Sequence, residues 1–195
     1  KEMLADAGKS FEGQSVVISG SGNVATYANQ KATQLGAKVV AMSDSNGYVV
    51  DENGIDFRII QQIKEQKRER ISTYPNYVPT AKYVEGCAGI WSVPCDIAMP
   101  CATQNEIDTD SAKLLVSNGC KAVFEGSNMP CTPEAIQAIK ASGLLYSPSK
   151  ASNAGGVAVS GLEMSQNSER LYWTFEAVDA KLKEIMEIGR ASCRE

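Results

Sequence analysis

A glycine-rich turn between an expected strand and an expected helix carries the residue pattern best suited to bind a ligand. The apolar run Val16-Val17-Ile18 leads into Gly20-Ser21-Gly22, and a helix-forming segment follows from Asn23 to Leu35. Gly20 allows a tight turn, Gly22 lets a pyrophosphate approach the backbone, and the small Ala25 allows the helix to pack on the strand. Free N–H groups at the helix start favour a bound phosphate. The turn therefore predicts a dinucleotide site, with a glycine-rich turn that binds nothing as the alternative.

An acidic residue follows the second expected strand, Lys38–Met42. Asp44 stands 24 residues after Gly20, where a carboxylate can bind the ribose hydroxyls of the adenosine and so favours NAD. Cations of the next expected helix would instead neutralise a 2′-phosphate, which favours NADP. A turn aspartate and a solvated helix face are the alternatives. We favour NADP over NAD, and the cations concerned are Lys64, Lys67, Arg68 and Arg70.

Neutral hydrogen-bonding side chains follow the strands expected at 96–99 and 122–125. The first strand is followed by Pro100-Cys101-Ala102-Thr103-Gln104-Asn105, and the second by Gly126-Ser127-Asn128. Hydroxyl and amide groups of this kind suit a ribose or a carboxamide. The Cys101 thiol is not expected to act as a nucleophile, because the chain has no histidine to activate it.

A second glycine-rich stretch, Asn153 to Gly161, lies near the end of the expected domain. Adjacent glycines at a helix start permit the close approach of a ligand. Ser160 lies seven residues after Asn153, which is about two helical turns, so both side chains can face one side of a helix. The alternative is a packing segment whose small residues let two backbones touch.

The alternation of strands and helices is typical of a doubly wound α/β sheet. The carboxyl ends of parallel strands meet at one edge, so the polar segments above are expected to converge on one crevice. A hairpin with the turn Asp51-Glu52-Asn53-Gly54 is expected beside the second strand, and Tyr74 to Pro94 is expected to be loop. We therefore expect a Rossmann-like fold with a mostly parallel sheet and helices on both faces. The expected strands are 16–18, 38–42, 48–50, 96–99, 122–125 and 144–146, and the expected helices are 23–35, 55–71, 108–118, one from Thr132, and 154–188 apart from the glycines at 155, 156 and 161.

Composition limits the class of protein. A chain of 195 residues with 43% hydrophobic and 22% charged residues is typical of a globular domain. The net charge of −4 argues against a nucleic-acid partner, and no apolar run reaches the ~20 residues that span a membrane. The sequence has 6 cysteines, no CxxC and no histidine, so we expect no metal site and reduced, intracellular cysteines.

With these segments assembled, the chain resembles the cofactor-binding domain of the hexameric bacterial glutamate dehydrogenases from about residue 1 to about residue 188. The glycine turn alone is not specific, whereas the blocks around Asn128 and Asn153 are. The residues that carry the resemblance are Ser19-Gly20-Ser21-Gly22-Asn23-Val24-Ala25, Pro100-Cys101-Ala102-Thr103-Gln104-Asn105-Glu106, Glu125-Gly126-Ser127-Asn128-Met129-Pro130, Asn153-Ala154-Gly155-Gly156-Val157 and Ser160-Gly161-Leu162-Glu163-Met164-Ser165-Gln166-Asn167.

The resemblance implies a reaction and a role for each matched position. The reaction is the reversible oxidative deamination of L-glutamate to 2-oxoglutarate and ammonia, with hydride transfer to NADP or NAD, in a cytoplasmic homo-hexamer. Val157 and Ser160 would reach toward the glutamate. The pyrophosphate would lie on Gly20, Ser21, Gly22, Asn23 and Val24, the adenosine ribose or its phosphate on Asp44 and Ser45, and the nicotinamide and its ribose on Ala102, Thr103, Gln104, Asn128 and Asn153.

The chain also departs from the family pattern. The family's catalytic lysine and aspartate belong to an N-terminal domain that this sequence does not include, so residues 1–188 are expected to bind the dinucleotide without catalysing by themselves. Ser127 stands where family members commonly have alanine. The segment 189–195 does not resemble the family's C-terminal continuation and is expected to be a non-native or disordered tail. A free-standing nucleotide-binding or regulatory module without hydride chemistry is the alternative function.

Overall fold

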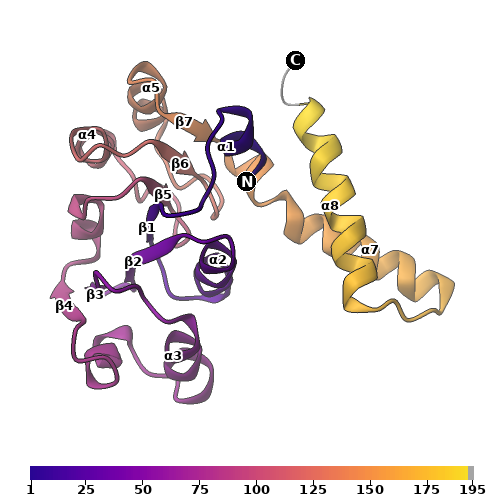
Figure 1. Ribbon diagram of the computed structural model, residues 1–195, viewed down its shortest axis with the longest axis horizontal. Helices are drawn as coiled ribbons and strands as arrows, with labels where there is room; N and C mark the ends of the chain where they lie inside the picture. The colour runs from indigo at the N-terminus through magenta and orange to yellow at the C-terminus, as the bar shows by residue number, and fades with distance from the viewer. Residues whose placement is uncertain (193–195) are drawn as a thin grey trace.

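A sheet forms the centre of the computed structural model, which describes residues 1–192 and the side chains of residues 1–187 (Figure 1). Its strands are β1 (Ser15–Ile18), β2 (Lys38–Ser43), β3 (Gly47–Val50), β4 (Lys82–Glu85), β5 (Ile97–Met99), β6 (Ala122–Phe124) and β7 (Leu145–Ser147). The 7 strands lie in the order β4-β3-β2-β1-β5-β6-β7. β1, β2, β5, β6 and β7 pair in parallel, whereas β3 and β4 pair antiparallel at one edge. The predicted α/β fold with a mostly parallel sheet is confirmed.

Helices cover both faces of this sheet (Figure 1). The described helices are α1 (Glu2–Asp6), α2 (Asn23–Gln34), α3 (Phe57–Gln61), the π-helix η1 (Gln62–Gln66), the 3-10 helices η2 (Ile71–Asn76) and η3 (Cys87–Ser92), α4 (Thr109–Ser117), α5 (Pro133–Ala141), α6 (Ser149–Ser152), α7 (Ala154–Glu169) and α8 (Phe175–Ser192), of which α7 and α8 lie away from the sheet. Along β1, Val16 and Ile18 pack with α1, α2 and α3, while Val17 packs with η3, α4 and α5. All three side chains are fully buried. A strand with apolar residues on both faces is typical of the middle of a parallel sheet.

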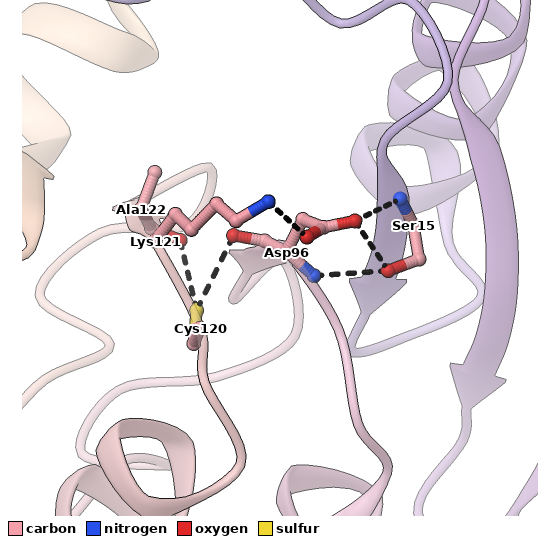
Figure 2. A network of polar contacts seen from close by, with 5 residues as sticks. All are labelled: Ser15, Asp96, Cys120, Lys121 and Ala122. Carbon is pink, nitrogen blue, oxygen red and sulfur yellow. Dashed lines mark hydrogen bonds and ion pairs between the residues drawn. The ribbon is translucent and has the colours of Figure 1, made fainter.

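A polar network joins the amino ends of β1, β5 and β6 (Figure 2). The carboxylate of Asp96, just before β5, accepts hydrogen bonds at 2.8 Å from both the backbone N–H and the hydroxyl of Ser15. Nζ of Lys121 lies 2.7 Å from the other carboxylate oxygen. Burial opposes ionisation of this carboxyl, but the bonds from Lys121 and Ser15 outweigh it and lower the pKa of Asp96. The network therefore stabilises the sheet at the edge opposite the carboxyl ends of the parallel strands.

The edge next to β2 differs from the prediction. β4 forms within the segment expected to be loop and pairs with β3. The hairpin consists of β2 and β3, so its turn is 44–46 and not Asp51–Gly54. The helix expected at 55–71 ends early, because α3 continues only as η1 and Arg68 then adopts a left-handed φ of 57°.

The C-terminal helical region is interrupted at a different place from the one expected. The glycines at 155, 156 and 161 lie inside α7, and the interruption is 170–174, where Arg170 has a φ of 55°. The Leu171 N–H closes the end of α7 by donating to the carbonyl oxygen of Gln166 at 3.2 Å. No helix among the described residues is both long and apolar enough to cross a membrane. The segment expected to be a tail, 189–195, extends beyond the described residues, and its nature stays a prediction.

Candidate dinucleotide-binding site

The turn between β1 and α2 leaves the start of the helix open. Gly20 has a φ of 86°, and a Cβ there would lie 3.2 Å from the backbone of residues 101–102, so this position requires glycine. A Cβ on Gly22 would meet no atom within 4 Å, and no side chain caps the helix. The N–H groups of Asn23 and Val24 are in the first turn, where they have no partner within the helix. The predicted tight turn is confirmed, and it exposes backbone donors to a phosphate.

Asp44 follows β2 as expected, but its carboxylate is directed into the β2–β3 turn. It accepts hydrogen bonds from the backbone N–H groups of Asn46 at 2.8 Å, Gly47 at 3.3 Å and Ile71 at 3.2 Å. The residue is buried. Asp44 therefore closes the turn and joins it to η2, as in the turn-aspartate alternative, and its contact with a ribose stays a prediction.

Ser45, the next residue, is exposed and contacts a cation from the connection between η1 and η2. Nη1 of Arg70 donates a hydrogen bond to the Ser45 hydroxyl at 2.6 Å. Lys64, one of the four cations predicted for a 2′-phosphate, donates instead to the carbonyl oxygen of Glu69 at 3.2 Å. The structure thus brings Arg70, and not Lys64, to the end of β2.

The loop after β5 is held by the side chain of Glu106. Its carboxylate accepts hydrogen bonds from the N–H groups of Ala102 at 3.1 Å and Thr103 at 3.3 Å. Burial raises the pKa of Glu106, although hydrogen bonds from Ser19 and these N–H groups oppose the shift. Ala102, Thr103 and Gln104 are exposed. The residues predicted to bind the ribose and the carboxamide therefore lie on a loop whose backbone is held by Glu106.

Cys101 lies beneath this loop and does not have the properties of a nucleophile. Burial, with a smaller contribution from the charge of Glu106, raises the pKa of its thiol to about 12. The thiol is therefore protonated at neutral pH, and it is not reactive because the thiolate is the nucleophilic form.

The backbone at Gly126 lies close to Cys101 and α2. A Cβ on Gly126 would clash with the Cys101 sulfur and would lie 3.5 Å from Val24. The ends of β5 and β6 and the start of α2 thus pack closely, and this contact requires glycine.

The loops after β6 and β7 meet through two amide side chains. Nδ2 of Asn153 donates a hydrogen bond to Oδ1 of Asn128 at 2.6 Å, across 25 residues of sequence. Asn128 is exposed and Asn153 is half-buried. The N–H groups of Gly126 and Ser127 donate to the carbonyl oxygen of Pro100 at 2.9 and 3.0 Å. The predicted convergence of the polar segments after β5, β6 and β7 is therefore observed.

Val157 and Ser160, predicted for the substrate, lie in the first part of α7. Asn153 immediately precedes this helix, which places its N-terminal end beside the amide pair. Val157 and Ser160 are both exposed, and residues three apart share one face of a helix. Their contact with a substrate stays a prediction.

The family model for Glutamate/Leucine/Phenylalanine/Valine dehydrogenase matches residues 1–195. The chain belongs to this family. A relative from Xylanibacter ruminicola, named NAD(P)-specific glutamate dehydrogenase, is 54% identical over 196 residues, which cover 99% of this chain and 44% of the relative. One from Haemophilus influenzae, named NADP-specific glutamate dehydrogenase, is 52% identical over 195 residues, or 98% of this chain and 43% of the relative.

Solved structures show the same relationship to the dehydrogenase family. The crystal structure of Plasmodium falciparum glutamate dehydrogenase has a TM-score of 0.91 at 52% identity, and the match covers 95% of this chain and 40% of that chain. The chain therefore spans less than half the length of the family members that it matches.

Three residues that the sequence analysis did not single out also shape the site in this chain. Glu106 was visible only as part of a matched block, Arg70 only as one of a run of cations, and Glu125 only as the residue before Gly126. Arg70 and Glu125 act through contacts between distant segments, for which the sequence alone has no signal. Glu106 binds the nearby N–H groups of Ala102 and Thr103. Within the part of the chain that is described, no three His, Cys, Asp or Glu side chains are grouped as metal ligands.

Proposed function

We propose that this chain is the NAD(P)-binding domain of a glutamate dehydrogenase, which converts L-glutamate to 2-oxoglutarate and ammonia with hydride transfer to NAD(P). The observation that carries the proposal is the 2.6 Å contact between Asn128 and Asn153, at the same edge of the sheet as the uncapped start of α2. A dinucleotide needs both features, because backbone N–H groups recognise its diphosphate and amides its carboxamide. The names of the relatives, NAD(P)-specific and NADP-specific glutamate dehydrogenase, support it.

The open start of α2 is the proposed diphosphate site. The N–H groups of Asn23 and Val24 would donate to its oxygens, and the positive end of the helix dipole favours the negative charge. Gly20 and Gly22 keep side chains out of this space. The bare backbone at Gly22 fits such a group, because a Cβ there would meet no atom within 4 Å.

The loops after β5, β6 and β7 are the proposed site of the nicotinamide and its ribose. Once Asn153 donates to Asn128, the Asn128 amide still has two N–H donors and the Asn153 amide still has its oxygen acceptor. A carboxamide needs a donor and an acceptor of this kind. The bound nicotinamide supplies the hydride acceptor. The residues proposed to surround it are Ala102, Thr103, Gln104, Asn128 and Asn153.

We infer that NADP is preferred over NAD. A guanidinium and a hydroxyl fit a 2′-phosphate, and Arg70 and Ser45 are joined at 2.6 Å on the exposed end of β2. The Asp44 carboxylate is directed into the turn, where it accepts hydrogen bonds from three backbone N–H groups. We therefore propose Arg70 for this contact in place of Lys64, which donates to the Glu69 carbonyl oxygen.

The substrate side of the proposed site is the first part of α7, with Val157 and Ser160 toward the glutamate. We propose that the catalytic lysine and aspartate belong to another part of the protein, so that this chain binds the cofactor but does not catalyse alone. The homo-hexamer and the cytoplasmic location are proposed from the resemblance.

The test is an assay of the full-length protein that contains this chain. We expect L-glutamate to drive NADP reduction, with a lower rate for NAD, and we expect the 195-residue chain to bind NADPH without reducing NADP. A full-length protein that binds NADPH but reduces neither cofactor with glutamate would contradict the proposal and favour a regulatory nucleotide-binding module.

A further inference from the structure

Glu125 is a buried carboxylate directly below the proposed nicotinamide site. It follows β6 and is only 2% exposed. One carboxylate oxygen, Oε2, accepts a hydrogen bond from the backbone N–H of Ser149 at 2.8 Å. The other, Oε1, is buried and has no hydrogen-bond partner among the described residues. A buried anion is costly unless strong contacts offset the loss of water. The burial of this carboxylate, with Oε1 unpaired, therefore needs a reason.

The bond from Glu125 closes a ring of contacts around the amide pair. Ser149 is the first residue of α6, and its carbonyl oxygen accepts a hydrogen bond from the Asn153 N–H at 2.9 Å. Asn153 then donates through its side chain to Asn128 at 2.6 Å, and Asn128 follows Glu125 by three residues. The Glu125 carboxylate is therefore the link through which the β6 loop holds the segment that carries Asn153.

The main chain of Glu125 is fixed independently of its side chain. Its N–H donates to the carbonyl oxygen of Ser147 at 3.1 Å, and the N–H groups of Gly126 and Ser127 donate to the Pro100 carbonyl oxygen. The β6 end of the ring is thus anchored to the sheet. The α6 end is held by the carboxylate at Ser149 and by the Ser152 hydroxyl, which donates to the Ser147 hydroxyl at 2.7 Å.

Two neutral polar groups, the Tyr146 hydroxyl and the Cys131 thiol, lie near the Glu125 carboxylate. Burial, and then the polar contact with the Glu125 carboxylate followed by its charge, raise the pKa of the Tyr146 hydroxyl and of the Cys131 thiol. Both groups therefore stay protonated at neutral pH, although neither lies in hydrogen-bonding geometry with Oε1.

We propose that Glu125 is a positioning residue that sets the separation of Asn128 and Asn153 and thereby the groups that receive the nicotinamide carboxamide. This inference rests on the proposed function. It assigns Glu125 no contact with the cofactor. Loss of its bond to Ser149 should therefore weaken binding of the nicotinamide half and leave binding of the adenosine half unchanged.

The test uses the full-length protein and calorimetric titration with two ligands, NADPH and 2′-phospho-ADP-ribose, which lacks the nicotinamide. For Glu125→Ala we expect about a ten-fold loss of NADPH affinity, the size of one buried charge-assisted hydrogen bond, and less than about a two-fold change for 2′-phospho-ADP-ribose. Glu125→Gln keeps an oxygen acceptor of the same length and should restore most of the affinity. Glu134→Ala, an exposed glutamate on α5, is the matched control and should match the wild type.

A second variant protects the test against misfolding of Glu125→Ala. Ser149→Pro removes the N–H donor and places the ring Cδ where that hydrogen bond lay, which separates the carboxylate from α6. Proline is tolerated at the first residue of a helix, and we expect the same selective loss. An equal loss for both ligands, or no loss for either, would overturn the inference. If the wild type binds 2′-phospho-ADP-ribose and NADPH equally well, or binds neither, the proposed function fails instead.

Discussion

The guanidinium of Arg70 reaches the Ser45 hydroxyl across 25 residues of sequence. The sequence indicated a run of cations after Asp44, but not which of them returns to the end of β2. That choice depends on Arg68, whose left-handed φ of 57° follows the end of η1. A continuous helix over 55–71, as predicted, contains no such reversal. The identity of the contacting cation therefore follows from where the helix ends.

Substitution of Arg70 tests this residue directly. Arg70→Ala should lower NADPH affinity about ten-fold or more, because a charge-assisted phosphate contact is lost, and leave NADH affinity unchanged. Calorimetry with both cofactors measures the effect. Lys64→Ala is the comparison variant and should change neither affinity, because Lys64 is bonded to Glu69. A loss of NADPH affinity in Lys64→Ala but not in Arg70→Ala would show that Lys64 contacts the 2′-phosphate, and it would contradict the role proposed for Arg70.

Some residue roles could be read from the sequence because they are local. The helix expected from Thr132 is α5, and Thr132 caps it by accepting a hydrogen bond from the Ala135 N–H, with Pro133 at the first helical position. Gly20 takes the positive φ that its turn requires. Asp44 is different, since one of its three N–H donors comes from Ile71, 27 residues further on. No pattern around Asp44 itself distinguishes a ribose ligand from a turn aspartate with a distant partner.

At the scale of elements, Asp96 joins β1, β5 and β6 at their amino ends. Its pKa is lowered in the folded protein, so the unfolded chain binds more protons than the folded one around its ordinary pKa. The stabilisation is therefore fully present above the unfolded pKa of about 4 and is lost as pH falls through the lower folded pKa. The link between the strands should weaken in acid.

Asp96→Asn isolates this charge because the amide oxygen can still accept a hydrogen bond. We expect the free energy of unfolding to fall by ~1 kcal/mol at pH 7 and the difference from wild type to shrink in acid. Urea denaturation of the wild type and the variant, at pH 7 and at an acidic pH below about 4, measures this difference. Asp110→Asn is the control, since its ion pair with Lys113 is exposed and should contribute little. A difference that stays constant or grows in acid would rule out the charge as the cause.

The elements of the parallel sheet could be predicted because each strand is an apolar run followed by small or polar residues. β4 could not, because Lys82–Glu85 is mostly exposed and two of its residues are charged. A strand at the edge of a sheet needs only one hydrogen-bonded neighbour and no apolar pattern, and charged residues are common there. Its existence follows from β3, with which it pairs over four positions.

At the scale of the whole molecule, α7 and α8 project away from the sheet and its covering helices (Figure 1). None of the α7 side chains is buried, and large apolar side chains of this region are exposed, including Val157 at 78% and Tyr172 at 96%. The matched relatives are more than twice as long as the part matched here. We expect these apolar side chains to contact other parts of the full-length protein.

The central claim is that a dinucleotide lies across the carboxyl edge of the sheet with its diphosphate on the start of α2. The most direct measurement is a crystal structure of the full-length protein with bound NADPH. We predict diphosphate oxygens within hydrogen-bonding distance of the backbone N–H groups of Asn23 and Val24, and the carboxamide beside Asn128 and Asn153. A cofactor bound with its diphosphate away from α2, or its nicotinamide away from the amide pair, would contradict the account.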